Sequence, residues 1–293
     1  MTIPFYKLQL AGNGFILIDL ADRNKPEGLT PDTFAEISYR LCNRKYGIGG
    51  AGTIFLAGDN TIRIFTAQGK PATEADDALL CAARFAFDSG RITHKQIIFK
   101  TPGEEKTLEV LGSHEFRLSI GSPFSFPGGL IITPGSGSPV EILEHNGIRA
   151  AYAAVHIHEN VLIAFPQTLG TLQFQDLSAL IKKAFPDKHV IPVIARTITR
   201  ETLLVRTKTE RNSGVCASAA AALVAAICAG NADQAVVCMF EQRDSDNQLD
   251  NILAQDRDNS RRLAVNWDTA INELQVIGSG GYLFEGNFDI PSE

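Results

Sequence analysis

Apolar positions along the chain recur with two different periods. Spacing typical of helices occurs in four segments, Pro31–Cys42, Ala75–Ser89, Asp176–Phe185 and Ala217–Gly230. Short apolar runs bounded by Gly, Pro, Asn or Asp predict strands at Phe15–Leu20, Thr53–Leu56, Thr61–Thr66, Gln96–Lys100, Thr107–Val110, Phe116–Ile120, Val161–Phe165, Thr202–Thr207, Gln234–Phe240, Leu263–Trp267 and Leu274–Ile277. Because the predicted strands do not alternate strictly with the helices, a uniform doubly wound parallel sheet is disfavoured. The pattern predicts a mixed α+β fold.

A strand, a turn and an apolar helix occur in the same order in both halves of the chain. In the first half, Thr61–Thr66 leads through a turn containing Gly and Pro to the helix at Ala75–Ser89. In the second half, Thr202–Thr207 leads through Glu-Arg-Asn-Ser-Gly to the helix at Ala217–Gly230. Both helices are apolar on nearly every face, which is typical of a helix wrapped by other structure. We expect two pseudo-symmetric domains, each a mixed β-sheet or barrel around a central apolar helix, with an active-site cleft between them.

The stretch from Gly121 to Pro139 is rich in Gly, Pro and Ser, which is typical of a boundary between domains. We therefore expect an N-terminal domain over residues 1–125 and a C-terminal domain over residues 126–269. Residues 270–293 are expected to complete the N-terminal domain.

Composition narrows the class of protein. The 293 residues are 44% hydrophobic and 20% charged, which is ordinary for a soluble globular protein. A net charge of −6 disfavours nucleic acid or an anionic membrane as the main partner. The start of the sequence lacks the pattern of a signal peptide, and five cysteines without a CxxC pair favour a reducing compartment. We expect a cytoplasmic protein whose partner is a small molecule, with no nucleic acid and no membrane involved.

Cys216 stands where the apolar helix of the second half begins. Ser213-Gly214 is turn and cap chemistry, so the thiol is predicted in or near the first helical turn. Free backbone N–H groups and the positive end of the helix dipole converge there, which lowers the pKa of a thiol and attracts an anion such as a carboxylate. The alternative is that Cys216 packs as a small apolar residue, because free cysteines are commonly buried.

Acidic residues stand at the start of the first apolar helix. Glu74, Asp76 and Asp77 complement the helix dipole and can cap free N–H groups, which explains them without any catalysis. The functional alternative is a carboxylate that acts as a general base in a cleft. On this stretch alone the capping interpretation is the simpler one.

Three further stretches raise the question of ligand binding. Gly47–Gly52 matches the letters GxGxxG, but it precedes a predicted strand, whereas the dinucleotide-binding motif precedes a helix. A glycine-dense turn close to a ligand is the better interpretation. His156 and His158 share one side of an extended segment, where ordinary edge-strand histidines are favoured over a metal pair. The segment Leu10–Phe15 is either a simple turn or a loop that presents the amide of Asn13 to a ligand.

Taken together, the sequence resembles the diaminopimelate epimerase family over essentially its whole length. The opening motif of that family, K-x-x-G-x-G-N-D-F-x-x-x-D, is similar to KLQLAGNGFILID, and its R-x-x-G-I-G-x-D resembles RKYGIGGA. Its ending, a strand with Trp followed by G-x-x-x-x-V-F-x-G, resembles AVNW and VIGSGGYLFEGNF. The positions retained in the first two motifs are Lys7, Gly12, Asn13, Phe15, Asp19, Arg44, Gly47, Ile48 and Gly49. The resemblance implies a cofactor-free acid–base pair of cysteines, one per domain, that inverts an amino-acid α-carbon.

The site positions depart from the pattern of that family. At the first site, Ala75 stands in place of the catalytic cysteine, and Asp76-Asp77 replace the Gly-Asn pair that binds a substrate carboxylate. At the second site, VCASAA resembles A-C-G-[ST]-G-A, so the resemblance makes Cys216 the other catalytic thiol. The Glu-Arg pair before it corresponds to Glu210-Arg211, or to Thr207-Lys208 if no gap is allowed. Negative charge at the mouth of the first helix would repel a substrate carboxylate, so meso-diaminopimelate is not the expected substrate.

The resemblance therefore implies a divergent, cofactor-independent isomerase that moves a proton at the carbon next to a carboxylate. We expect Cys216 as one acid/base group and a carboxylate in place of the missing thiol, from Glu74, Asp76 or Asp77. The substrate is expected to be an amino acid or a related small acid. The expected substrate-binding residues are Asn13, Thr66, Glu210, Arg211, Ala217 and Ser218. No metal and no cofactor are expected, and a homodimer is compatible with the sequence.

Two alternatives stay open. The alanines at positions 75 and 217 also fit a catalytically silent relative that keeps the fold in order to bind a small ligand or a partner. A single-cysteine nucleophilic enzyme is weaker, because no histidine lies close to Cys216 in the sequence.

Overall fold

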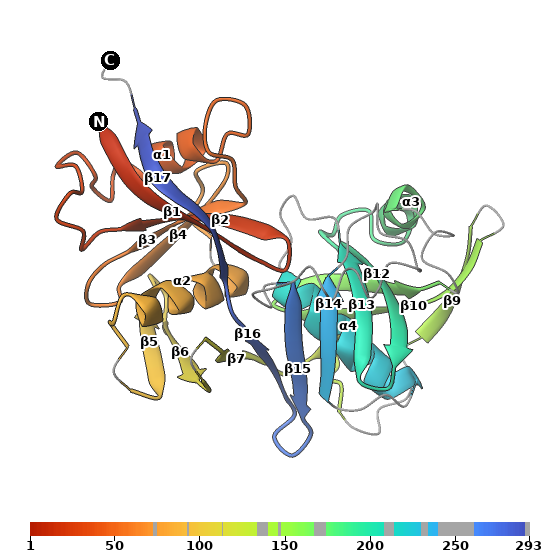
Figure 1. Ribbon diagram of the computed structural model, residues 1–293. Helices are drawn as coiled ribbons and strands as arrows, with labels where there is room; N and C mark the ends of the chain where they lie inside the picture. The colour runs from red at the N-terminus through yellow and green to blue at the C-terminus, as the bar shows by residue number, and fades with distance from the viewer. Residues whose placement is uncertain are drawn as a thin grey trace. The chain divides into compact units, whose positions relative to one another are not determined.

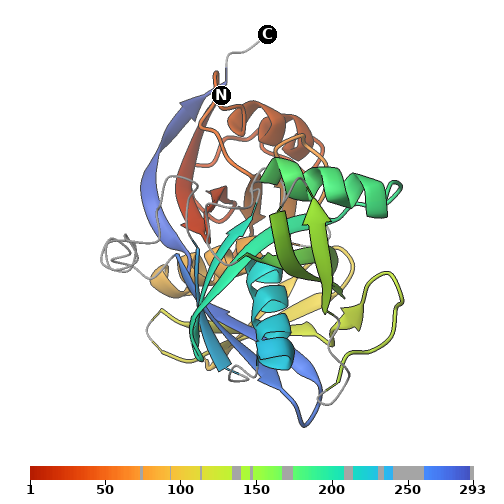
Figure 2. The same cartoon turned by 90° about the vertical axis from the view of Figure 1, so that its right-hand side faces the viewer.

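The computed structural model of the chain describes residues 1–72, 75–92, 94–112, 114–133, 140–145, 148–166, 174–207, 214–229, 234–239 and 261–290. These residues form mixed sheets and four helices (Figures 1 and 2). The chain divides into two compact units, Met1–Leu118 with Gly278–Glu293 and Ser119–Ile277. Within the described ranges, no helix combines the length and the apolarity needed to cross a membrane.

The first unit is built on a five-stranded sheet in the order β17-β1-β2-β3-β4. Its strands are β1 (Thr2–Leu10), β2 (Asn13–Asp19), β3 (Gly52–Leu56), β4 (Ile62–Thr66) and β17 (Gly281–Asp289). β2 and β3 run parallel, and the other neighbours run antiparallel. The pairing of β1 with β17 sets Thr2 opposite Asp289, so the start and the end of the described chain lie side by side (Figure 1).

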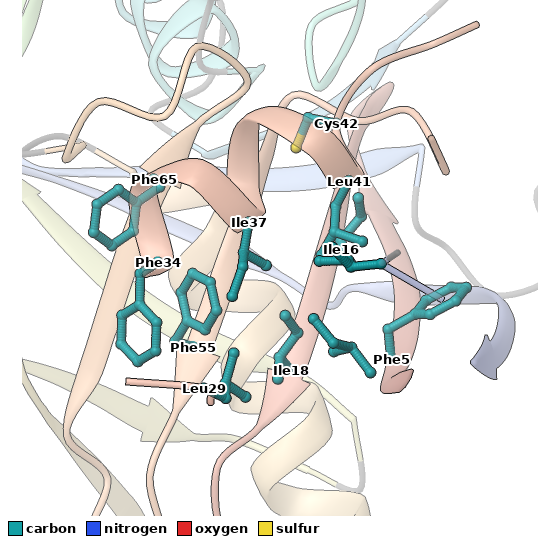
Figure 3. Packing of buried hydrophobic residues seen from close by; sticks show 12 residues of the cluster. Phe5, Ile16, Ile18, Leu29, Phe34, Ile37, Leu41, Cys42, Phe55 and Phe65 are labelled. Atoms are coloured by element: carbon teal, nitrogen blue, oxygen red, sulfur yellow. The ribbon is translucent and has the colours of Figure 1, made fainter. Parts of the chain in front are cut away.

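One face of this sheet packs under α1 (Phe34–Leu41). Ile16 and Ile18 of β2 share a buried cluster with Phe34 and Phe55, whose rings stack with 3.8 Å between their centroids (Figure 3). The buried apolar residues of α1 lie three and four positions apart, which is the spacing of a helix with one apolar side. This cluster is the core on the α1 side of the sheet.

The opposite face of the sheet is covered by α2 (Asp76–Asp88), as Figure 1 shows. Phe15 and Leu17 alternate with the isoleucines of β2 and are also buried, so side chains of this strand are covered on both faces. α2 packs against β1, β2 and β3, and its residues Asp76–Ala83 are all buried. Such a helix has no solvent-facing stripe in its first half, as the sequence predicts.

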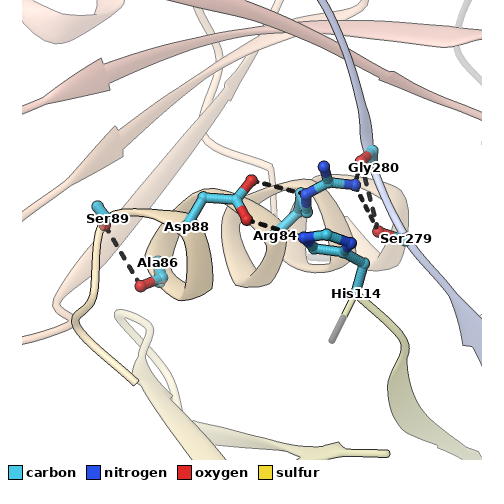
Figure 4. A network of polar contacts seen from close by, with 7 residues as sticks. All are labelled: Arg84, Ala86, Asp88, Ser89, His114, Ser279 and Gly280. Atoms are coloured by element: carbon cyan, nitrogen blue, oxygen red, sulfur yellow. Dashed lines mark hydrogen bonds and ion pairs between the residues drawn. The ribbon is translucent and has the colours of Figure 1, made fainter. Parts of the chain in front are cut away.

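The second half of α2 is tied to the segment that leads into β17. Arg84 pairs with Asp88 at 2.7 Å and also donates to the hydroxyl of Ser279 and the carbonyl oxygen of Gly280, at 3.4 and 3.3 Å (Figure 4). His114 reaches the other oxygen of Asp88 at 3.2 Å. The approach to β17 is therefore held against the helix by side-chain contacts.

Three antiparallel strands follow α2 in the chain: β5 (Gln96–Lys100), β6 (Glu105–Val110) and β7 (Phe116–Gly121). β6 is paired on both sides, with β5 and with β7.

The second unit is a mixed sheet in the order β16-β15-β14-β13-β12-β11-β10-β8, with β9 paired to β10. Its strands are β8 (Phe124–Ser125), β9 (Val140–His145), β10 (Ile148–Ile157), β11 (Glu159–Phe165), β12 (Ile191–Thr199), β13 (Thr202–Thr207), β14 (Gln234–Met239), β15 (Arg262–Asp268) and β16 (Glu273–Gly278). The parallel pairs β11–β12 and β13–β14 are each connected through a helix, as parallel neighbours require. These helices are α3 (Phe174–Ala184) and α4 (Gly214–Ala229).

α4 is the most apolar helix of the described chain. It packs against strands β10 to β15 (Figure 2), and its residues 214–225 are all buried. Alanine, a strong helix former of small volume, fills half of these positions. The strands can therefore approach the helix closely on several sides.

The predicted mixed α+β fold and all four predicted helices are confirmed. α4 begins at Gly214 and not at Ala217, so it starts closer to the preceding strand than the apolar pattern indicates. Six strands were not predicted: β1, β8, β9, β10, β12 and β17. The predicted strands that are present agree with the structure to within about two residues at each end.

Candidate functional site

The glycines of the GIGGAG segment pack against atoms of the same unit. A Cβ on Gly47 would lie 2.3 Å from the carbonyl oxygen of Arg40, and a Cβ on Gly52 would lie 2.4 Å from a carbonyl oxygen of β4. A Cβ on Gly50 would lie 2.8 Å from the Nζ of Lys7. Close packing thus accounts for these glycines without a bound ligand.

Replacing Gly47 by alanine is expected to lower the free energy of unfolding by about 1–3 kcal/mol or more, because the new methyl group overlaps three backbone oxygens. Urea denaturation measures this loss. Gly103→Ala is the control, since a Cβ at Gly103 has no atom within 4 Å, and it is expected to change stability little. Equal losses in the two variants would contradict the packing interpretation.

The turn between β1 and β2 fixes the position of Asn13. Ala11 and Gly12 have φ of +50° and +86°, the two positive values that a type I′ hairpin turn requires. The side chain of Asn13 is 4% exposed, and its Nδ2 donates a hydrogen bond to Oδ2 of Asp77. The segment is therefore a tight turn that directs an amide to a carboxylate of the same unit.

Two carboxylates are buried in the first turn of α2. Asp76 is 3% exposed and Asp77 is 1% exposed. Both carboxylates lie at the positive end of the helix dipole, and Asp77 accepts the hydrogen bond from the amide of Asn13. The preceding N-cap is Ala75, whose side chain offers no acceptor to the helix. Among the described residues, the polar side chains at the start of this helix are therefore those of the two aspartates.

Lys7 brings a positive charge into the same unit. It lies on β1, is 6% exposed, and its Nζ donates a hydrogen bond to the carbonyl oxygen of Gly49. Burial lowers the pKa of the Lys7 amine, because the charged form loses hydration, and Arg44 also lowers it. The sequence marks Lys7 only as a retained position of a motif. The available signal was the place of this lysine among alternating apolar residues, shortly before the turn at Ala11-Gly12.

Cys81 lies one turn further along α2 than Asp77. Burial raises the pKa of the Cys81 thiol well above its ordinary value, and the carboxylate of Asp77 raises it further, whereas Lys7 lowers it. Gly280 packs on this residue, since a Cβ there would lie 3.0 Å from Sγ. A thiol with these surroundings stays protonated at neutral pH and is not a nucleophile.

Cys216 is the third residue of α4, so its predicted place in the first turn is confirmed. Its side chain is 1% exposed, and the thiol donates a hydrogen bond to the carbonyl oxygen of Ile157, next to the turn between β10 and β11. Cys216 therefore lies in a buried first turn, with its thiol hydrogen-bonded to the backbone of the same unit. Ala217 and Ser218, which follow it, are fully buried.

A second buried cation precedes α4. Arg206, at the end of β13, is buried, and burial lowers the pKa of its guanidinium. Its neighbour Thr207 is also buried and donates its hydroxyl to the carbonyl oxygen of Pro192 at 3.2 Å. The sequence does not single out Arg206, because an arginine inside a predicted strand gives no signal of burial.

The histidines of HIHEN form local contacts. Nδ1 of His156 lies 2.9 Å from Oδ1 of Asn160, whose Nδ2 donates to the carbonyl oxygen of His189 at 3.0 Å. His158 has φ of +55° in the turn between β10 and β11. Among the residues that the structure describes, no three His, Cys, Asp or Glu side chains gather as a metal site requires.

The remaining predicted residues divide into two groups. The hydroxyl of Thr66 accepts hydrogen bonds from the backbone N–H groups of Gln68 and Lys70, both at 3.3 Å, so it stabilises the turn after β4. Three predicted residues lie outside the described residues: Glu74, Glu210 and Arg211.

Comparisons with known sequences identify relatives that carry the name diaminopimelate epimerase. No protein-family model matches the chain. The diaminopimelate epimerase of Pelotomaculum thermopropionicum is 26% identical over 240 residues, which cover 77% of this chain and 82% of the relative. The diaminopimelate epimerase of Nostoc punctiforme is 29% identical over 253 residues, which cover 80% of this chain and 87% of the relative.

Solved structures share the fold. A phenazine biosynthesis protein of the PhzF family from Bacillus anthracis superposes with a TM-score of 0.65 at 14% identity, covering 99% of this chain and 100% of that one. A hydroxyproline epimerase from Agrobacterium vitis, solved with bound trans-4-hydroxy-L-proline, superposes with a TM-score of 0.56 at 10% identity, covering 98% and 91%. The fold is thus the mixed α+β fold of the PhzF and racemase-type proteins. By sequence, the chain is similar to proteins named diaminopimelate epimerase, at 26% and 29% identity.

Proposed function

We propose that this protein is a cofactor-independent racemase or epimerase that moves a proton at the carbon next to a carboxylate. The observation that carries this proposal is the chemistry of two buried helix starts. α2 opens with Asp76 and Asp77, and α4 carries Cys216 in its first turn. The names of the relatives, diaminopimelate epimerase, support the same class of reaction.

The order of elements supports two related domains. β2, α1, β3, β4 and α2 follow one another in the first unit, and β11, α3, β12, β13 and α4 follow in the same order in the second. The pairs β2–β3 and β11–β12 are both parallel. We infer pseudo-symmetric domains over residues 1–125 with 270–293 and over 126–269, each with a central helix, and an active-site cleft between them.

The proposed reaction uses one group from each helix start. The carboxylate of Asp77 accepts the proton from the α-carbon, and the electron pair is delocalised into the substrate carboxylate. The thiol of Cys216 then gives its proton to the opposite face of that carbon, which inverts it and leaves a thiolate. Proton exchange with water returns both groups to their starting forms. Asp76 and Glu74 are the alternative acceptors.

The substrate is proposed to be a small amino acid or a related acid other than diaminopimelate. Asp76 and Asp77 put negative charge where the diaminopimelate epimerase pattern has Gly-Asn, so the substrate carboxylate is not proposed to bind at this helix start, as it does in that pattern. The proposed substrate-binding residues are Asn13, Thr66, Glu210, Arg211, Ala217 and Ser218. Asn13 acts in part through Asp77, since its amide donates to that carboxylate.

Hydrogen exchange in heavy water tests the proposal. The protein is incubated in D₂O with a panel of amino and 2-hydroxy acids, without added cofactor, and NMR follows the α-proton signal. We expect loss of that signal for at least one acid, with no loss in a sample of heat-unfolded protein. Absence of exchange across the whole panel would contradict the proposed reaction.

A second candidate, a catalytically silent relative that binds a small ligand, is favoured by one observation. Cys216 is almost fully buried and donates its hydrogen bond to a protein carbonyl. Iodoacetamide at neutral pH separates the two functions, because an inert buried thiol reacts slowly. Rapid, selective alkylation of Cys216 contradicts the silent alternative. A thermal shift with a bound acid, without exchange, supports it.

A further inference from the structure

The turn that follows α1 carries a basic and aromatic tip at the surface of the first unit. Arg44, Lys45 and Tyr46 are all exposed, and Tyr46 is 85% exposed. Within the described ranges, neither of the two cations forms an ion pair with a carboxylate of the chain. Two positive charges and a large ring therefore lie side by side in contact with solvent. We refer to these three residues as the basic tip.

The basic tip is held in place by its own backbone. Oδ1 of Asn43 accepts hydrogen bonds from the N–H groups of Lys45 and Tyr46, at 2.9 and 3.0 Å. The N–H of Gly47 donates to the carbonyl oxygen of Asn43 at 2.9 Å, and Ile48 packs against the buried cluster next to α1. A surface that is already ordered loses little conformational entropy when a partner binds it. The tip is therefore suited to binding a partner without rearrangement.

An exposed surface of the opposite charge lies on β17 of the same unit. Its consecutive residues Tyr282, Leu283 and Phe284 are 37%, 55% and 50% exposed. Glu285, which follows them, is exposed as well, and β17 contains no lysine or arginine. We refer to Tyr282–Glu285 as the acidic apolar strip.

Two side chains of the acidic apolar strip are supported by neighbours in the first unit. The ring of Phe284 meets that of Phe5 edge-to-face, with 5.9 Å between the centroids. The guanidinium of Arg84 lies 5.5 Å from the centroid of the Tyr282 ring. Half-exposed aromatic side chains with such support are typical of the residues that carry binding energy at protein interfaces.

Leu283 forms a β-bulge at the margin of the sheet, where β17 is the edge strand (Figure 1). In the pairing with β1, Phe284 lies opposite Lys7 and Tyr282 lies opposite Leu8, so Leu283 is an extra residue. A bulge disfavours the addition of a further strand along an edge. A partner of the strip is therefore expected to contact its side chains and not to extend the sheet.

We propose that two copies of this chain pair with each other, with the basic tip of each copy bound to the acidic apolar strip of the other. Arg44 and Lys45 then face Glu285, and Tyr46 packs against the apolar residues of the strip. A two-fold pair contains this contact twice, which doubles the area that it buries.

Charge favours a second copy as the occupant. Each copy has a net charge of −6, so two copies repel each other unless a basic surface of one meets an acidic surface of the other. Both surfaces are present on every copy, so the pairing needs no further protein. The inference goes beyond the proposed function, and its test uses no substrate.

Charge reversal tests the pairing. Sedimentation equilibrium of the full chain, over a series of concentrations at low and at high salt, measures the dissociation constant of the dimer. We expect a dimer that salt weakens, and we expect Lys45→Glu and Glu285→Lys each to raise the dissociation constant about tenfold or more, because like charges then meet twice in each pair. Lys188→Glu, at an exposed lysine of the second unit, is the matched control for net charge and is expected to change the constant little.

The double variant Lys45→Glu/Glu285→Lys separates a direct contact from a general effect of charge. It restores opposite charges across the proposed contact, so we expect it to recover most of the affinity that either single variant loses. All the variants change exposed side chains, so they are expected to fold, which urea denaturation checks. A monomer at every concentration overturns the inference, as does a dimer that neither single variant weakens. Weakening by both single variants without recovery in the double variant overturns it as well.

Discussion

Cys216→Ala is expected to reduce α-proton exchange about 10²–10⁴-fold, the usual cost of removing a general acid or base. The substitution shortens a buried side chain by one atom next to alanines that are already part of α4, so the helix is expected to remain folded. The wild type and the variant are compared by the rate of deuterium incorporation into the best acid of the panel. The exchange rate is expected to fall, whereas substrate binding is expected to change little, because the thiol donates the proton and is not proposed to hold the substrate.

Cys42→Ala is the matched control for this experiment. Cys42 is also a buried free thiol, with its sulfur 3.4 Å from the hydroxyl of Thr53, and burial raises the pKa of its thiol. We expect Cys42→Ala to keep exchange within a few fold of the wild type. A Cys216→Ala variant that exchanges as fast as the wild type would remove the thiol from the mechanism and favour a different donor.

Asp77→Asn is expected to lower exchange by a similar factor, about 10²–10⁴-fold, since asparagine keeps the shape but cannot accept the α-proton as a carboxylate does. The hydrogen bond with Asn13 can be retained through the amide oxygen, so the turn before β2 is expected to keep its structure. Exchange rates and a urea melt are measured on the same preparation. A large loss of exchange with a small loss of stability is the expected outcome.

Asp88→Asn, at the other end of α2, is the control for Asp77→Asn. Asp88 is paired with Arg84 and His114 and has no part in the proposed reaction (Figure 4). Because this pair is partly solvent-exposed, its loss is expected to cost at most about 1 kcal/mol and to leave exchange unchanged. If Asp77→Asn is fully active and Asp76→Asn is not, the acceptor is Asp76, and the assignment of Asp77 is wrong.

The helices could be predicted because their pattern is local, whereas several strands depend on their neighbours. β1 carries Pro4 and Lys7 within nine residues, yet it is paired on both sides. β10 contains the run Ala150-Ala151-Tyr152-Ala153-Ala154, which has the composition of a helix. Strand formation there reflects pairing with β9 and β11 more than intrinsic preference.

β17 was missed for a different reason. Its apolar residues Tyr282, Leu283 and Phe284 are consecutive and exposed, so they show no alternation between core and solvent. Its pairing with β1, at the other end of the sequence, makes it a strand. No local window of the sequence contains that information.

The residues of the candidate site also divide into those that a local pattern predicts and those that depend on distant parts of the chain. The place of Cys216 in a first helical turn follows from cap and propensity rules, and it could be predicted. The contact between Asn13 and Asp77 joins residues 64 positions apart and requires the packing of α2 on β2. The burial of Lys7 likewise depends on the close approach of the backbone at Gly14 and Gly50.

The pairing of β1 with β17 also sets the order in which this protein can mature on a ribosome. The backbone groups along one side of β1 wait for partners that are translated after the whole of the second unit. During that interval the nascent chain carries an open sheet margin, a surface on which strands of other chains can add. Completion of the first unit is therefore a late event of synthesis.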